Sequence, residues 1–232
     1  MSDTRTNAGV DNFSVTRKQF IWQSEDRVIT IMTAGNLATT QAVISLLEER
    51  SKAATDRDPT IMRQPTMFQV ARLVGDTLKE VIAETSDTGE DASAKFRATM
   101  IVGGQIAGGQ PTLFLVYPEG NFIEATDDTP FFQIGETKYG KPIIVRAYDP
   151  DMSFEDAAKL LLVSFDSTVK ANLSVGLPFD IMFYESGSLA IQHQRRIEMD
   201  DEYYNAISVG WGAALKNAFD SLPAYISDTT KG

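Results

Sequence analysis

Apolar and polar residues alternate, or form short apolar runs between turn residues, in several segments of this chain. Such segments predict β-strands, since side chains along a strand point to opposite faces. Turn-forming residues separate them, such as Pro118, Gly120 and Asn121. The predicted strands are residues 1–6, 17–23, 28–33, 96–106, 112–117, 122–125, 130–134, 179–184 and 189–197, the last two forming a hairpin across 185–188.

Helical spacing of apolar residues predicts four longer helices. One follows Gly35, one starts at Met67, and one starts near Asp200. The fourth opens at Ser153, where Asp156 three residues later forms a capping-box pattern, and runs to about residue 169. It is apolar nearly all round, which predicts burial on more than one side or against another subunit. Residues 135–140 are predicted to be a loop or short helix, and 56–65 and 85–94 polar loops.

The order of these elements predicts a single α+β domain over residues 1–232. Two blocks of strands, with helices between and after them, favour sheets stacked between helical layers. No linker, internal repeat or low-complexity tract interrupts the 232 residues.

Composition and charge narrow the classes of function. The formal net charge is −11, which argues against a nucleic-acid or anionic-membrane surface. No run approaches the ~20 apolar residues of a membrane span. The absence of cysteine excludes disulfides and thiolate catalysis, and it favours a cytoplasmic location. The single histidine, His193, excludes a paired-histidine metal motif, and neither a metal nor an organic cofactor is expected.

Charged residues near the N-terminus are the candidates for chemistry. Asp3, Arg5 and Lys18 lie close in sequence to segments that are predicted to be core strands. Such a cluster is more often a structural ion-pair network than a catalytic site. Similarly, Gly35 alone describes an ordinary strand-to-helix turn, where glycine provides backbone freedom.

The order of several short motifs resembles a known superfamily. They are Ser2-Asp3-Thr4-Arg5, Arg17-Lys18 and Ala34-Gly35-Asn36, with the longer strings SDTRTNAGVDNFS at 2–14, GETKYGKP at 135–142 and SVGLPFD at 174–180. In this order they are similar to the proteasome β-type subunits and the related HslV peptidase. The longer strings are most similar to the bacterial Anbu family, the ancestral β subunit.

The resemblance implies a four-layer αββα sandwich of the N-terminal-nucleophile (Ntn) hydrolase type. In that superfamily a Thr or Ser at the mature N-terminus attacks an amide carbonyl, and its own α-amino group, with a pKa near ~8, serves as the base. It also implies assembly into a homo-oligomer, as a ring or a helical ring, that acts on peptides or proteins. Whether an ATP-dependent unfoldase is a partner stays open.

The resemblance assigns roles to five residues of this chain. Lys18 matches the catalytic lysine, Asp3 the aspartate that orients it, and Arg5 the arginine beside that aspartate. Gly35 matches the glycine whose N–H donates to the oxyanion, a task that suits a helix N-terminus. Ser174 matches the serine in the loop after the long helix.

Three positions depart from the proteasome pattern. Glu136 stands where proteasome subunits have a serine. The aspartate expected three residues before Ser174 is Ala171, with Asn172 beside it. No residue matches the nucleophile, so we expect the first strand, which carries it, to lie upstream of Met1. Ser2 is a poor substitute, because alternation along a strand turns it away from the face of Asp3.

These observations leave three functions open. The first is a threonine- or serine-type peptidase subunit whose nucleophile lies upstream, so that the chain as given is expected to be inactive. The second is a non-catalytic assembly subunit of the same fold. The third is an amide hydrolase for a specific peptide or conjugate, since fold alone does not determine the substrate. Retention of both Asp3 and Lys18 favours an enzyme, because a buried charge pair is costly to keep.

Overall fold

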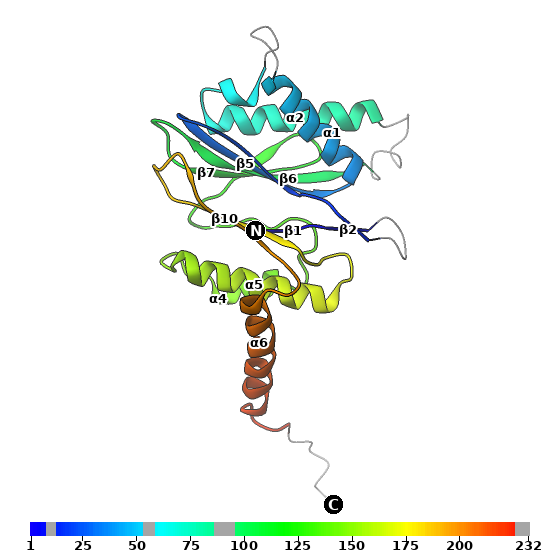
Figure 1. Cartoon of the computed structure of the whole chain (residues 1–232), viewed down its shortest axis with the longest axis vertical. Helices are drawn as coiled ribbons and strands as arrows, with labels where there is room; N and C mark the ends of the chain where they lie inside the picture. The colour runs from blue at the N-terminus through cyan, green and yellow to red at the C-terminus, as the bar shows by residue number, and fades with distance from the viewer. Residues whose placement is uncertain (8–12, 53–58, 86–95, 226–232) are drawn as a thin grey trace, which may run out of the picture.

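Two β-sheets lie face to face between layers of helices in the computed structural model of the chain (Figure 1). The structure describes residues 1–7, 13–52, 59–85 and 96–225. Helices α1 and α2 cover the outer face of the first sheet, and helices α4 and α5 cover the second. This is the predicted αββα sandwich.

The first sheet is a five-stranded antiparallel meander in the order β4-β5-β6-β7-β8. Its two long central strands, β5 and β6, are buried along most of their length because both of their faces are covered. Gly104 has a φ of 148°, and a β-carbon there would lie 2.0 Å from the carbonyl oxygen of Val28. The strands are β4 (Gln19–Ser24), β5 (Arg27–Gly35), β6 (Ala98–Ile106), β7 (Thr112–Val116) and β8 (Phe122–Glu124).

Helices α1 (Leu37–Lys52) and α2 (Met67–Thr85) bury apolar faces against this sheet. The side chain of Asn36 accepts a hydrogen bond from the N–H of Thr39 at 3.0 Å, which caps the start of α1. A short 3₁₀ helix, η1 (Ile61–Arg63), precedes α2. The larger core contains Ile29, Ile31, Leu47, Val70, Leu78, Met100 and Phe114 among its fully buried members.

The second sheet has the order β1-β9-β10, with β1 (Ser2–Asp3), β9 (Phe179–Tyr184) and β10 (Ile191–Ile197). The chain then leaves this sheet to form a two-stranded hairpin, β2 (Arg5–Asn7) with β3 (Phe13–Val15). The single strand predicted at 1–6 is therefore two strands. Thr4, the residue between β1 and β2, is fully buried.

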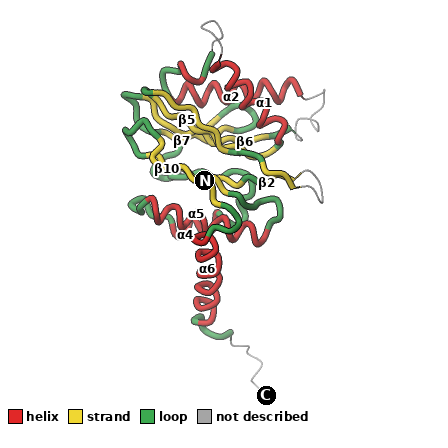
Figure 2. The backbone as a smooth tube through the Cα atoms, viewed as in Figure 1, coloured by secondary structure: helices red, strands yellow, loops and turns green. Residues whose placement is uncertain are grey.

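Helices α4 (Lys141–Ala147) and α5 (Phe154–Ala171) pack below the second sheet, and α6 (Glu202–Asp220) extends away from the body (Figure 2). Ser153 caps α5 as predicted, accepting a hydrogen bond from the N–H of Asp156. The middle of α5 is buried or half-buried on all sides, which confirms the burial predicted from its composition. A smaller core contains Leu162, Phe179, Ile181, Ile197 and Tyr204.

Two predictions for this half were wrong. Residues 130–134 form no strand, although they are apolar. A strand requires a hydrogen-bonding partner, and this segment packs its side chains instead, with the Phe131 ring 5.7 Å from that of Tyr148. Helix α4 was not predicted beyond a possible short helix ending at Gly140. The predicted loop at 85–94 falls almost wholly outside the described residues.

Candidate active site

An ion pair joins Lys18, in the turn before β4, to Asp3 of β1. The ammonium Nζ of Lys18 lies 2.8 Å from Asp3 Oδ1 and donates a second hydrogen bond to the carbonyl oxygen of Arg5 at 2.6 Å. The two charged side chains are only 22% and 12% exposed. A lysine ammonium has three hydrogens, and the third finds no acceptor among the described residues. Lys18 is therefore held firmly and has one hydrogen left to donate.

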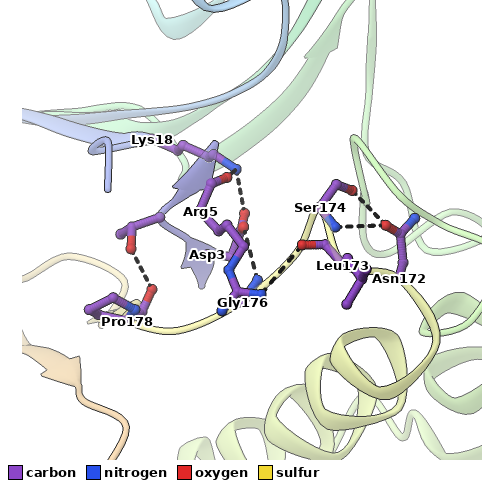
Figure 3. Close-up of polar contacts among 9 residues, drawn as sticks. Asp3, Arg5, Lys18, Asn172, Leu173, Ser174, Gly176 and Pro178 are labelled. Carbon is purple, nitrogen blue, oxygen red and sulfur yellow. Dashed lines mark hydrogen bonds and ion pairs between the residues drawn. The ribbon is translucent and has the colours of Figure 1, made fainter. Parts of the chain in front are cut away.

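The loop after α5 holds Asp3 and its neighbour in place (Figure 3). The N–H of Gly176 donates to Asp3 Oδ2 at 3.4 Å, so both carboxylate oxygens of Asp3 accept hydrogen bonds. The hydroxyl of Thr4 donates to the carbonyl oxygen of Pro178 at 2.8 Å. These contacts link residues more than 170 positions apart in the chain.

Arg5 reaches the same loop. Its guanidinium donates to the carbonyl oxygen of Leu173 at 3.4 Å and lies against Gly176. A β-carbon at position 176 would lie 2.3 Å from the guanidinium carbon, so only glycine leaves room for Arg5. Arg5 therefore links β2 to the loop that holds Asp3.

Ser174 lies in this loop, between the two backbone groups that hold Arg5 and Asp3. Its hydroxyl and its N–H both donate to Asn172 Oδ1, at 2.7 and 2.9 Å. The amide nitrogen of Asn172 donates in turn to Glu136 Oε2 at 2.7 Å. A carboxylate only accepts, so this chain of bonds has one direction, and the oxygen of Ser174 remains available as an acceptor.

Two donors hold the carboxylate of Glu136. The N–H of Lys138 donates to Oε1 at 2.8 Å, and Asn172 donates to Oε2. The hydrogen bond from the Lys138 backbone, supported by that of Asn172, lowers the pKa of Glu136 below its ordinary value. Glu136 is therefore an anion at neutral pH.

Gly35 is the last residue of strand β5, at the end of the sheet that lies near Lys18. The N–H of Thr33 donates to the carbonyl oxygen of Lys18 at 2.9 Å, and Gly35 follows two residues later. Its φ is 111°, and a β-carbon there would lie 2.5 Å from the carbonyl oxygen of Arg97. A β-carbon at Gly135 would lie 3.4 Å from that of Ala34, so the loop that carries Glu136 lies against the same end of β5.

The fold thus brings Asp3, Arg5 and Lys18 into direct contact and places Ser174 on the loop that holds them. Gly35 lies two residues after Thr33, which is hydrogen-bonded to the backbone of Lys18. The role of Gly35 as an oxyanion donor stays a prediction. Ser2 pairs with Asp180 in the sheet, and its buried hydroxyl has no hydrogen-bond partner among the described residues. No described serine or threonine hydroxyl is hydrogen-bonded to Lys18.

Sequence reasoning did not find the Asn172–Glu136 hydrogen bond or the contact of Gly176 with Arg5. Both join segments that are far apart in the chain, and neither follows from a local pattern. The signal available was indirect, because Glu136 departs from the proteasome pattern and Asn172 lies beside Ala171, which departs from it too.

Two other kinds of feature were sought in the described residues. They contain no cluster of three or more histidine, cysteine, aspartate or glutamate side chains placed to hold a metal ion. Their helices are too short or too polar to cross a membrane.

Comparison with known proteins identifies the family. The model of the family described as "Proteasome subunit" matches residues 21–181, more than half of the chain. No curated protein matches the chain.

Among the solved structures that match the chain, the following three each cover 97% of it. Anbu from Hyphomicrobium sp. strain MC1 is 46% identical, with a TM-score of 0.89 over 94% of that protein. Anbu from Yersinia bercovieri, described as an ancestral β-subunit, is 44% identical, with a TM-score of 0.89 over 94% of its length. Anbu from Pseudomonas aeruginosa, described as a helical assembly, is 43% identical, with a TM-score of 0.88 over 92% of its length. The chain therefore belongs to the proteasome family, in its Anbu branch.

Proposed function

We propose that this chain is the subunit of an N-terminal-nucleophile amide hydrolase that acts on peptides. In this proposal the nucleophile is the hydroxyl of a threonine or serine encoded upstream of Met1. Lys18 is a catalytic residue, Asp3 and Arg5 position it, and the N–H of Gly35 stabilises the oxyanion. The observation that carries the proposal is the half-buried Lys18–Asp3 pair, with one ammonium hydrogen free to donate.

The contacts of this pair support a chemical role over a purely structural one. A charge pair taken out of water gains little net stability, because the desolvation cost offsets much of the attraction. Asp3 uses both carboxylate oxygens and Lys18 two of its hydrogens, yet the third points to no described acceptor. A positioned cation with a spare donor suits the task of holding a nucleophilic hydroxyl oxygen.

The proposed reaction has two steps. The hydroxyl oxygen forms a bond to the amide carbon, and its proton passes to the α-amino group of the same residue, while backbone N–H groups stabilise the charge on the carbonyl oxygen. The amine then leaves with that proton. Water attacks the resulting ester, releases the acid and regenerates the hydroxyl.

The direction of the hydrogen bonds at Ser174 fits this scheme. Its hydroxyl hydrogen is used by Asn172, so the oxygen can accept from an N–H donor. In the proposed site that donor is the α-amino group of the nucleophile or the leaving amine.

Assembly with further copies is part of the proposal. The Pseudomonas aeruginosa relative, 43% identical over 97% of this chain, is described as a helical assembly. We extend this property to the present chain, as a homo-oligomer in the cytoplasm.

The test starts from the coding sequence upstream of Met1. A threonine or serine codon about fifteen residues back, opening an alternating apolar strand, supports the proposal; an in-frame stop codon there contradicts it for this gene product. The extended chain is then treated with a β-lactone that acylates N-terminal hydroxyl groups, and the labelled residue is identified by mass spectrometry.

Variants separate the role of Lys18 from a general effect on folding. Labelling is expected to be lost in Lys18→Ala and retained in Lys52→Ala. Lys52 is a suitable control because it also pairs with a carboxylate, that of Glu48, but on the exposed surface of α1. Equal labelling of both variants refutes the role assigned to Lys18.

A further inference from the structure

Helix α6 is attached to the rest of the molecule only near its start. Tyr204 and Ile207 pack in the smaller core, and Lys170 of α5 donates to Ser208 at 2.9 Å. From residue 212 to residue 225 every position is exposed. At 1.5 Å per residue, α6 is about 28 Å long, and its outer half extends away from the sandwich (Figures 1 and 2).

The exposed part of α6 carries an apolar stripe. Ile207, Trp211, Leu215 and Phe219 recur every four residues, and Leu222 follows two residues after the helix ends. We call Leu215, Phe219 and Leu222 the α6 stripe; Trp211, at its inner end, is only half-exposed. Leu215, Phe219 and Leu222 are 51%, 70% and 65% exposed. The side that enters the core at Ile207 thus continues onto a surface that no described residue covers.

This helix is poorly suited to stand alone. Isolated helices shorter than about 12–15 residues are marginal in water, and most helical stability comes from packing an apolar face. Gly210 and Gly212 lie in its interior with open space around them, and each weakens the helix relative to alanine. A surface that covers the α6 stripe would provide the missing packing.

A groove of matching character lies at the base of α6. Its volume is about 550 Å³, and Ile143, Met152, Leu160, Val163 and Trp211 provide apolar side chains to its wall. The indole nitrogen of Trp211 is buried and has no acceptor among the described residues. A buried donor without an acceptor is costly, so this wall of the groove is not fully satisfied within one copy.

Charge adds a second match between the helix and the groove. Asp149 and Asp151 line the groove and pair with no cation among the described residues, whereas Asp156 already pairs with Lys159. Lys216 is the only basic residue of α6; it pairs with Asp220 of the same helix, but both side chains are more than half exposed, so that an acidic surface can compete for the lysine. The acidic rim and this lysine are complementary, and both are present on every copy of the chain.

The surface available is of the right size for a specific contact. A buried aromatic side chain covers about 150–250 Å². One aromatic ring and two leucines therefore offer a few hundred Å² on each copy, and the groove, with Trp211 in its wall, adds more. A standard interface uses about 800 Å² per partner.

We propose that the partner of α6 is a second copy of this chain, whose α4–α5 groove receives the α6 stripe. This inference names the contact for the assembly part of the proposed function and rests on that part alone. The α6 stripe and the groove are different surfaces of one copy. Each copy can therefore receive the α6 of one neighbour in its groove while its own α6 binds the groove of another neighbour.

The first experiment compares self-association of the full chain and its variants by sedimentation velocity, over a range of concentrations. The wild type is expected to exceed the monomer mass of 25.5 kDa. Leu215→Glu and Phe219→Glu should each weaken association by roughly 30-fold or more, as for loss of a buried anchor at an interface. The matched control is Val209→Glu, because Val209 is an exposed apolar residue of α6 (75%) that is not part of the α6 stripe, and this change should have little effect.

Two further measurements keep the test valid if a stripe variant unfolds. Lys216→Glu should weaken association, and adding Asp151→Lys should restore it. Because the chain has no cysteine, Met152→Cys and Leu222→Cys can be prepared separately, mixed and oxidised. A disulfide between the two variants is expected, and little between two copies of either one.

The outcomes separate this inference from the proposed assembly. A wild type that stays monomeric at every concentration overturns both. An assembled wild type whose folded stripe variants associate equally tightly, with no mixed disulfide, overturns only the assignment of α6 to the groove.

Discussion

Gly176 lies directly against the guanidinium of Arg5, closer than any β-carbon would permit. The contact joins β2 to the loop after α5, and the same glycine donates its N–H to Asp3. One residue of the loop therefore positions both charged groups of the strand segment.

Gly176→Ala is expected to displace Arg5, because the new β-carbon would lie 2.3 Å from the guanidinium carbon. Overpacking of this kind costs about 1–3 kcal/mol in the free energy of unfolding. Urea denaturation measures the loss. Gly210→Ala is the control, since its β-carbon meets open space in a helix and should be neutral or stabilising. Equal destabilisation by both changes would contradict the contact.

Lys18→Met should destabilise the protein more than the double change Asp3→Asn with Lys18→Met. The single change leaves the Asp3 carboxylate, 12% exposed, without its cation, a loss of about 1–3 kcal/mol or more. The double change leaves no charge unpaired. A double-mutant cycle on the free energy of unfolding measures the coupling. Additive effects would show that the two side chains do not interact.

Glu136→Gln should loosen the loop that carries Ser174. The carboxylate accepts from both Lys138 and Asn172, whereas a glutamine side chain has only one oxygen to accept with. Faster hydrogen exchange at the Ser174 N–H, with little change at Phe179 in the core, is the expected result. Unchanged exchange at Ser174 would exclude a role for Glu136 in holding the loop.

The hydrogen bonds of the Glu136 carboxylate should stabilise the Ser174 loop at neutral pH and lose this effect in acid. Because the folded pKa of Glu136 is lower than its ordinary value of 4.5, the stabilising effect is complete above that value. It is lost as the pH falls through the folded pKa. Exchange at Ser174, corrected for the intrinsic rate, should rise only in that acidic range, and it should not change with pH there in Glu136→Gln.

Tyr204 should ionise at a higher pH than a tyrosine in water. Burial, with the nearby Asp166 carboxylate, raises its pKa from 10.0 to about 12. The folded state then holds a proton that the unfolded state loses, so this stabilising effect is complete below pH 10 and is lost as the pH rises towards 12. Absorbance at 295 nm follows the ionisation, and the late step should vanish in Tyr204→Phe.

Local patterns were sufficient for most of the secondary structure. The long strands β5 and β6 and the helices α2, α5 and α6 have strong apolar periodicity, and they were predicted with small errors at their ends. The segment 130–134 failed because an apolar run does not reveal whether a strand partner is present. Helix α4 was missed because it is short and lacks a clear period.

The candidate site shows the same division. Asp3, Arg5 and Lys18 were found because they lie near one another in the sequence and in a motif order shared with a family. The hydrogen bonds from Gly176 to Asp3 and from Asn172 to Glu136 could not be found in this way. Each of them joins two residues that are 36 or more positions apart in the chain.

The sequence by itself determined the αββα class and the charged residues of the candidate site, because periodicity and motif order are local properties of the chain. Only the tertiary structure decided which backbone groups hold Asp3, which side chains set the direction of hydrogen bonding at Ser174, and that the outer half of α6 lies exposed. These features depend on how the two sheets close over each other. The docking of distant loops is set by the packing of the whole core, and no single segment encodes it.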